Sequence, residues 1–312
     1  MSDIKLFRFT GNIAQEIDGK ASHLEKALQS LIELNLTPLL GIRFLATEYS
    51  TGKTHSGRID TLGLDENSCP VIIEYKRTTG ENVINQGLFY LDWLMDHKAE
   101  FKLMVLEKYD KPAADAIDWS SPRLICIAAD FTRYDVHAVQ QINRNIDLVR
   151  YRRFAPDLIL LELVNSVAAD PLPSDDKLEK APAKPGKVLG LGDKPVNEWL
   201  AEMPPALAPI FEALEVYVLS LGDDVQRKDL KLYVAFKRLR NFATIVFQKA
   251  RLRLFLHLDP EKIQHVEGLT RDVRAVGHWG TGDVEIGLGS LDELQRAKPF
   301  IQAAYEGGIH AG

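Results

Sequence analysis

Two acidic side chains and a lysine stand at a spacing that can build a hydrolytic metal site. Asp60 ends the short sequence Gly-Arg-Ile-Asp, Glu74 follows fourteen residues later, and Lys76 lies two positions beyond Glu74. Because strand side chains alternate between faces, Glu74 and Lys76 point the same way, and a hairpin would bring Asp60 to Glu74. Carboxylate oxygens suit Mg²⁺ or Mn²⁺, and a neighbouring lysine can orient a water molecule or, as the neutral amine, take its proton. The spacing therefore predicts a site for metal-assisted hydrolysis.

The elements that must position these residues follow from the apolar pattern. Asp60 and Glu74 fall in two strand-like runs, residues 58–64 and 71–76, joined by a short polar turn. Further strands are predicted at residues 44–49, 124–129, 146–154 and 158–164, and helices at 23–35, 81–97 and 136–143. Helices that alternate with strands predict an α/β fold, a mixed sheet flanked by helices.

Composition limits the classes of function. The chain has 312 residues, 46% of them hydrophobic, and a formal net charge of -6. Such a charge argues against binding nucleic acid through bulk positive charge, although a local basic patch or metal ions can still do so. No signal peptide and no apolar run near the ~18 residues of a membrane span are recognisable. We therefore expect a cytoplasmic protein with no membrane partner.

A shift in composition predicts two domains. The stretch over residues 169–195 is rich in Pro, Lys and Asp and lacks any apolar period, so we interpret it as a linker. Residues 1–168 would form the first domain and residues 196–312 a small α+β accessory domain, concerned with substrate recognition. In the latter, helices are predicted at 204–221 and 291–305, and strands at 243–248, 252–258 and 284–288.

The residues of the first domain resemble a known nuclease signature. Asp60 followed by Glu74-x-Lys76 is similar to the motif of the PD-(D/E)XK nuclease superfamily, with Ile-Asp in place of Pro-Asp. Gln86 and Tyr90 resemble the Gln-x-x-x-Tyr helix motif of its RecB-like and NucS-like branches, and four positions apart they share one helix face.

The resemblance implies a restriction-endonuclease-like fold and a DNA endonuclease that depends on Mg²⁺ or Mn²⁺. Glu25 matches the first-helix glutamate that contributes to metal binding in that fold, so the implied metal ligands are Asp60, Glu74 and Glu25. The implied catalytic residues are Asp60, Glu74, Lys76, Gln86 and Glu25. Candidate DNA contacts are Arg58, Tyr90, Arg150, Arg152 and Trp279. The expected partners are DNA and a second copy of the chain. The accessory domain has no counterpart in NucS-like enzymes, so mismatch specificity is not carried over.

Structural interpretations stand beside these hypotheses. Asp60, Glu74 and Lys76 also fit an ordinary cross-strand ion pair at a solvated sheet edge. Gln86 and Tyr90 also fit a packing role, and the arginines near residue 151 fit a charged strand edge. The alternative function is a protein that binds nucleic acid without cutting it, or senses a ligand, on a nuclease-like fold.

Two features of the accessory domain invite a binding role. The sequence Gly-His-Trp-Gly-Thr-Gly-Asp over residues 277–283 fits a ligand or nucleic-acid recognition loop, with Trp279 as a stacking surface, and equally a structural turn. A second feature is a set of basic residues that we expect on one helix face, whether facing phosphates or solvent, namely Lys228, Lys231, Lys237, Arg238 and Arg240.

Overall fold

The computed structural model describes residues 4–21, 25–52, 56–79, 82–155, 157–168 and 194–307. Contacts divide the chain into two compact units, residues 1–170 and 171–312, and each is described by itself. The linker predicted over residues 169–195 lies outside the described residues except for its last two positions, so this boundary stays a prediction.

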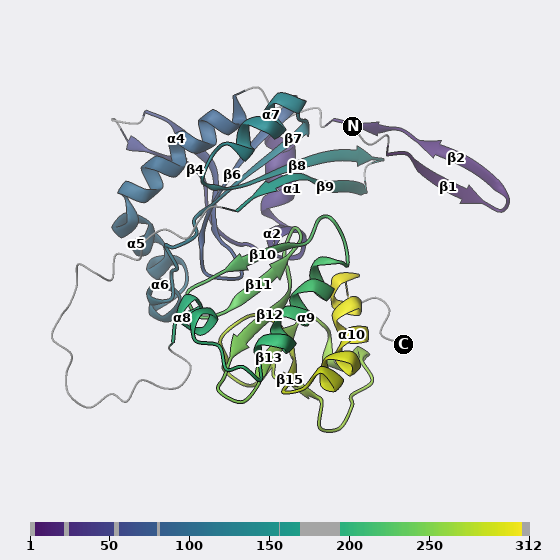
Figure 1. Ribbon diagram of the computed structural model, residues 1–312. Coiled ribbons are helices and arrows are strands. Elements are labelled where there is room, and N and C mark those ends of the chain that lie inside the picture. The colour runs from purple at the N-terminus through teal and green to yellow at the C-terminus, as the bar shows by residue number, and fades with distance from the viewer. Residues whose placement is uncertain are drawn as a thin grey trace. The chain divides into compact units, whose positions relative to one another are not determined.

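In the described part of the N-terminal unit, seven strands form one mixed sheet in the order β3-β8-β7-β6-β5-β4, with β9 added beside β8 (Figure 1). The strands are β3 (Gly19–Lys20), β4 (Arg43–Ser50), β5 (Arg58–Leu64), β6 (Pro70–Thr79), β7 (Arg123–Asp130), β8 (Asn145–Phe154) and β9 (Leu158–Val167). The pairs β6–β7 and β7–β8 are parallel, and the remaining pairs are antiparallel. The predicted strand 58–64 has the same bounds as β5.

Helices cover this sheet and close its core. They are α1 (Glu25–Glu33), α2 (Leu36–Leu40), α4 (Val83–Asp96), α5 (Lys98–Lys108), α6 (Lys111–Asp115) and α7 (Arg133–Gln140). Apolar residues of α4 such as Leu91 and Leu94 pack with Ile72 of β6 and Leu124 of β7 in one buried cluster. The mixed sheet flanked by helices that the sequence predicts is therefore confirmed.

The sequence did not predict an N-terminal hairpin or the helices α5 and α6. Strands β1 (Leu6–Thr10) and β2 (Ile13–Ile17) pair only with each other, and Figure 1 shows them extending away from the sheet. Nearly all of their residues are exposed. Such a hairpin buries little apolar surface, so its short runs carry none of the burial pattern used to recognise the other strands.

In the described part of the C-terminal unit, six strands form a sheet in the order β10-β11-β12-β13-β15-β14, and every pair is antiparallel. The strands are β10 (Gln226–Asp229), β11 (Val234–Lys237), β12 (Asn241–Phe247), β13 (Leu252–Leu256), β14 (Thr270–Asp272) and β15 (Val284–Leu288). Helices α8 (Val196–Ala201), α9 (Ala208–Leu219) and α10 (Leu291–Tyr305) share one buried core with the sheet. This confirms the predicted α+β architecture.

The basic helix expected between residues 228 and 240 is wrong. Lys228 lies on β10 and Lys237 on β11, and both are buried. The two strands pair antiparallel, with Lys228 opposite Ala235 and Lys237 opposite Gln226. The charges happen to recur at helical spacing, but alternating apolar residues such as Val234 and Phe236 decide the secondary structure by burying into the core.

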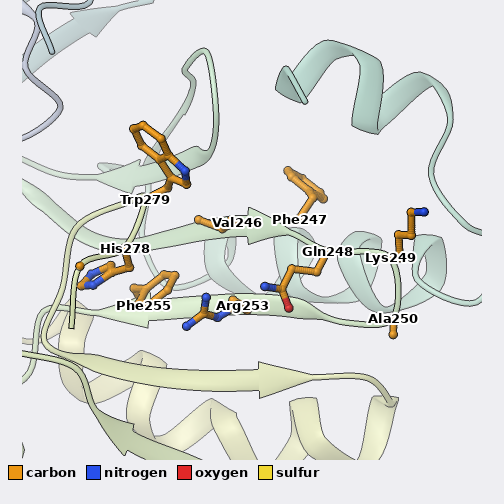
Figure 2. Close-up of a pocket in the computed structure, with 10 residues that line it drawn as sticks. Val246, Phe247, Gln248, Lys249, Ala250, Arg253, Phe255, His278 and Trp279 are labelled. Carbon is orange, nitrogen blue, oxygen red and sulfur yellow. The ribbon is translucent and has the colours of Figure 1, made fainter. Parts of the chain in front are cut away.

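The segment that precedes β15 lies against β12 and β13 on the sheet, and Figure 2 shows His278 beside Phe255 and Trp279 above the strands. No helix in the described part of the chain is both long enough and apolar enough to cross a membrane.

Candidate active site at the edge of β5 and β6

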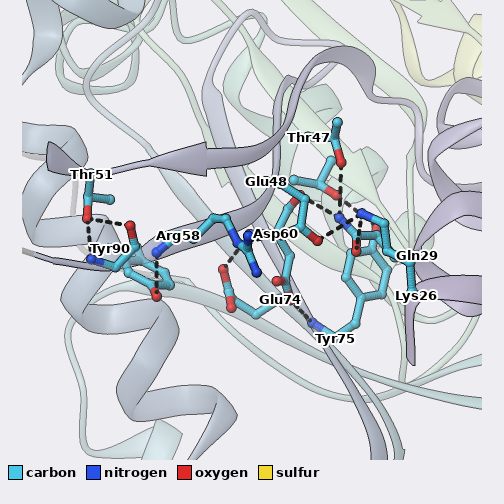
Figure 3. Close-up of polar contacts among 12 residues, drawn as sticks. Lys26, Gln29, Thr47, Glu48, Thr51, Arg58, Asp60, Glu74, Tyr75 and Tyr90 are labelled. Carbon is cyan, nitrogen blue, oxygen red and sulfur yellow. Dashed lines mark hydrogen bonds and ion pairs between the residues drawn. The ribbon is translucent and has the colours of Figure 1, made fainter. Parts of the chain in front are cut away.

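Strands β5 and β6 part at the position of Asp60 and Glu74. Their ladder runs from Leu64 opposite Pro70 to Thr61 opposite Ile73 and stops one step short of the two acids. There the carboxyl groups replace the ladder, because the Asp60 amide donates to Glu74 Oε1 at 3.2 Å. In return, the Tyr75 amide donates to Asp60 Oδ2 at 3.0 Å. The two carboxyl groups lie side by side, as the spacing in the sequence predicts (Figure 3).

Glu74 is the most unusual of these groups. Its side chain is fully buried, and Oε2 has no hydrogen-bond partner among the described residues. Burial, together with the neighbouring Asp60 carboxylate, raises the pKa of Glu74 to about 9. A buried acceptor left unpaired costs about 1–3 kcal/mol, and more when it is charged. Without a cation, Glu74 therefore holds a proton at neutral pH.

Asp60 shares this environment but is partly open to solvent. Burial raises the pKa of Asp60 most strongly, and the hydrogen bond from the Tyr75 amide and the nearby Lys76 ammonium oppose that rise. Two carboxyl groups this close cannot both ionise easily, so the pair shares its protons. A bound cation would relieve the same repulsion.

Lys76 and Glu25 lie together at the end of β6. Lys76 Nζ stands 3.5 Å from Glu25 Oε1, and the Arg77 amide donates to Glu25 Oε2 at 3.0 Å. Both oxygens of Glu25 thus contact β6. Across the described residues, no group of three or more His, Cys, Asp or Glu side chains is arranged to hold a metal ion. In this structure Glu25 contacts Lys76 and the Arg77 amide, and its role as a metal ligand with Asp60 and Glu74 stays a prediction.

Two residues near Asp60 were missed at the sequence level. Gln29 of α1 is buried, and its amide donates to the Asp60 backbone oxygen at 2.7 Å. Glu48 of β4 has a positive φ of 51 and pairs with Lys26 at 2.8 Å and Arg58 at 2.5 Å. The hydrogen bond from Lys26 is the main cause that lowers the pKa of Glu48. The spacing of four residues between Glu25 and Gln29 places both on one helix face, and it was the one sequence signal that could have pointed to Gln29.

Tyr90 fixes the start of β5 rather than standing free. Its hydroxyl accepts a hydrogen bond from the Arg58 amide at 3.1 Å. A Cβ at Gly57 would approach the Tyr90 ring to 2.5 Å, so only glycine permits this contact. Gln86, one turn earlier on α4, is half-buried. The Arg58 side chain is exposed at the same edge, where it pairs with Glu48.

The other candidate DNA contacts are dispersed. Arg150 is buried and held by Asp130 at 3.0 Å and by Glu162 at 2.6 Å, so its charge is used within the fold. Arg152 donates to the Ile4 backbone oxygen at 3.3 Å. Trp279 belongs to the C-terminal unit, where half of its side chain is exposed. Of the DNA contacts suggested by the sequence, the structure brings Arg58 and Tyr90 to the acidic pair.

Both the C-terminal unit and the whole chain are similar to known proteins. Residues 196–307 match a domain of unknown function, DUF5655, which accounts for the C-terminal unit. The whole chain is 31% identical over 307 residues to an uncharacterized protein of Haemophilus influenzae, covering 96% of this chain and 99% of that protein. The chain therefore belongs to the same family as that protein.

Two solved structures also resemble part of the chain. One is an EndoMS-dsDNA2 complex, at 20% identity and a TM-score of 0.28 over 44% of this chain. The other is a repair endonuclease from Pyrococcus abyssi, at 18% identity and a TM-score of 0.26 over 43% of this chain. The chain matches about half the length of each, 47% and 48% respectively.

Proposed function

We propose that the N-terminal unit is a metal-dependent DNA endonuclease of the PD-(D/E)XK class, similar in its catalytic half to NucS-like enzymes. The observation that carries the proposal is the Glu74 carboxyl group, which is buried beside Asp60 and has one oxygen without a partner among the described residues. An ordinary cross-strand ion pair would leave both oxygens satisfied by cations or water. Perturbed, unsatisfied carboxyl groups at the end of a ladder are typical of functional sites.

The residues at this edge fit Mg²⁺ or Mn²⁺. Asp60 and Glu74 offer hard oxygen ligands, Glu74 with a free oxygen, and a backbone carbonyl of the same edge can join them. When bound, such a cation supplies Lewis-acid chemistry, lowering the pKa of water and stabilising negative charge on a phosphodiester. Binding it would displace the proton that Glu74 otherwise holds.

The chain's own residues divide the remaining work. Lys76 points the same way as Glu74, and we assign it the positioning and activation of the attacking water, to which its ammonium group can donate hydrogen bonds. Glu25 accepts from the Arg77 amide and contacts Lys76 Nζ, so it holds that ammonium in place. Arg58 is exposed beside the acidic pair and can exchange its ion pair with Glu48 for one with a DNA phosphate. Gln86 and Tyr90 support the site from α4.

The test is direct. The full chain is incubated with supercoiled plasmid, linear duplex and single-stranded DNA, each with Mg²⁺, Mn²⁺ or EDTA. We expect cleavage of at least one substrate with a cation, none in EDTA, and none by Glu74→Gln in any buffer. Cleavage that persists in EDTA, or that Glu74→Gln retains, would contradict the site. Binding of DNA without cleavage under every condition would favour the alternative of a non-cleaving nucleic-acid-binding protein.

A further inference from the structure

The C-terminal sheet has a second face that the helices do not cover. Along β12 and β13, alternate residues such as Ile245 and Leu254 enter the core with α9 and α10. The intervening residues Val246 and Phe255 form a separate small buried cluster with Val273. That cluster lies under the segment of residues 273–283, so the segment acts as a cover for this face.

Neutral hydrogen bonds fix the covering segment to the sheet through Thr281. The Thr281 amide donates to Thr244 Oγ1 at 3.0 Å, and Thr244 Oγ1 donates back to the Thr281 carbonyl at 2.9 Å. Asn241 donates to Thr281 Oγ1 at 3.1 Å, and His257 Nε2 stands 2.8 Å from the same oxygen. Thr244 and Asn241 are buried, and His257, which directly follows β13, is partly buried. This end of the segment therefore has a defined position.

Two glycines bring the backbone down onto the strands. Gly280 has φ +87, and a Cβ there would stand 2.6 Å from Thr244 Oγ1. Gly282 has φ +126, and a Cβ would stand 2.8 Å from the Leu256 backbone. Both positions exclude other residues by conformation and by space. Trp279 precedes this anchored stretch, and half of its side chain is nevertheless exposed.

A cavity of about 670 Å³ opens between the segment and the β12–β13 hairpin. Its volume lies in the range of about 300–1,000 Å³ that small-molecule sites occupy. Figure 2 shows Trp279 and His278 at one end and Gln248 and Lys249 toward the other. The His278 ring stacks on Phe255 with centroids 4.3 Å apart and planes 10° apart. Flat aromatic surfaces thus lie at one end of the cavity.

Positive charge and an amide lie toward the other end. Lys249 is exposed in the turn after β12 and forms no ion pair with another described residue. Arg253 is held by Glu285, with Nε 2.8 Å from Oε1, and also lies over the Phe255 ring. Among the described residues, no carboxylate lines the cavity. A planar ligand with an anionic group at one end matches this arrangement.

We propose that this cavity binds a nucleotide, with the base stacked on Trp279 and the phosphate near Lys249. An aromatic platform accepts any base because every base has a π-face, and a lysine binds phosphate as a point charge. Gln248 can donate to and accept from a base edge. A free nucleotide and an unpaired nucleotide in a DNA strand share this chemistry. The proposal concerns binding alone and does not depend on cleavage by the N-terminal unit.

Binding is measured by titration calorimetry with the full chain in EDTA, where the proposed nuclease is inactive. The probes are adenosine 5′-monophosphate, a short single-stranded oligo(dA) and a blunt duplex. Trp279→Ala should weaken binding of the monophosphate or the single strand roughly 5- to 100-fold, the range of one base–aromatic stack. Trp279→Phe keeps a ring and should stay within about threefold of wild type.

Charge is tested separately. Lys249→Gln should weaken binding of the same probes, whereas Arg296→Gln, an exposed cation on α10 across the sheet, should not. Trp279-dependent binding of the monophosphate identifies a free nucleotide as a ligand, and such binding of the strand alone identifies an unpaired nucleotide of DNA. The proposal is overturned if neither the monophosphate nor the single strand binds. It is also overturned if Trp279→Ala binds them like wild type, or if only duplex binding requires Trp279. Unchanged thermal unfolding of each variant guards against loss of fold.

Discussion

The two units treat their polar groups in opposite ways. In the N-terminal unit, two strands part and carboxyl groups take over the hydrogen bonds of the ladder. The buried Glu74 Oε2 then has no partner in the part of the chain that the structure describes. In the C-terminal unit, the sheet stays paired and Thr281 is bonded through its amide, carbonyl and hydroxyl. The unusual feature there is an aromatic side chain, Trp279, half of which is exposed to solvent.

This difference matches what each kind of site costs the fold and what it provides. An unpaired buried carboxyl destabilises the fold, and a protein retains one where a cation or a reaction makes use of it. An exposed aromatic ring on an anchored segment costs little and offers stacking to a ligand with little loss of entropy. The first arrangement suits chemistry, and the second suits recognition.

Removing a member of the acidic site should abolish chemistry. Asp60→Asn, Glu74→Gln and Lys76→Ala should each lower DNA cleavage by about 100-fold or more, because cation placement and water activation act as a unit. Glu107→Gln on α5 removes an exposed carboxylate of the same unit and should leave the rate unchanged. Calorimetry should show Mn²⁺ binding retained by Lys76→Ala and lost by Asp60→Asn. Wild-type rates in both acid variants would exclude this site.

The same substitution of Glu74 should stabilise the fold at high pH. The pKa of Glu74 is raised to about 9 in the folded chain, so between pH ~4.5 and ~9 the unfolded chain releases a proton that the folded chain retains. The free energy of unfolding of the wild type therefore falls as pH rises through this window. Glu74→Gln removes that slope.

The gain should reach roughly 3–6 kcal/mol at the top of the window. Denaturant titrations in EDTA, followed by circular dichroism at several pH values, measure it. Mn²⁺ should raise the midpoint of the wild type and not that of the variant. Equal pH slopes for the two proteins would show that Glu74 is ionised in the native state.

The C-terminal unit should respond to pH with the opposite sign. Burial lowers the pKa of His257 to about 4, so below pH ~6.5 the unfolded chain takes up a proton that the folded chain refuses. The contribution of the neutral His257 to stability is present above pH ~6.5 and is lost as pH falls to about 4. The loss should amount to roughly 2–3 kcal/mol.

His257→Gln keeps a polar group toward Thr281 and should remove most of that acid sensitivity. Trp199 lies in the core of the C-terminal unit, and its fluorescence during denaturation reports on this unit in a chain whose Trp93, Trp119 and Trp279 are replaced by Phe. If His257→Gln loses as much stability at acid pH as the wild type, other groups cause that loss. His265 contacts the Pro260 carbonyl oxygen and is more exposed than His257. The substitution His265→Gln is therefore the matched control.

Local sequence pattern predicts much of this molecule. The strand 58–64, the strand 284–288 and the helix 291–305 have the bounds observed for β5, β15 and α10, because apolar periodicity records which side faces the core. The proximity of Asp60 and Glu74 also follows from pattern, since it requires only two paired strands and the correct register.

What pattern misses depends on docking between distant elements. Gln29 reaches Asp60 because α1 packs on β5. Glu48 has a left-handed backbone and pairs with Lys26 of α1. The spacing of four residues between Glu25 and Gln29 is the one local signal for Gln29, and Glu48 has none. Glu25 illustrates the reverse case, in which the residue was found but its contact was not. The metal role of Asp60, Glu74 and Glu25 stays a prediction, and so do the DNA contacts that the sequence suggests.

The smallest effect should come from a residue that touches no reacting atom. Gln29 donates to the Asp60 carbonyl, to Thr47 Oγ1 at 3.2 Å and to Glu33 Oε1 at 3.0 Å, so it ties α1 to the strand at the point where β5 leaves β6. The C-terminal sheet needs no such side chain, because its strands remain paired. Gln29→Leu should lower kcat about tenfold, equivalent to about 1.4 kcal/mol, with little change in KM for DNA. Gln140→Leu, an exposed glutamine on α7, is the control. A merely structural role would reduce the folded fraction and leave kcat per folded molecule unchanged, and that result would remove Gln29 from the site.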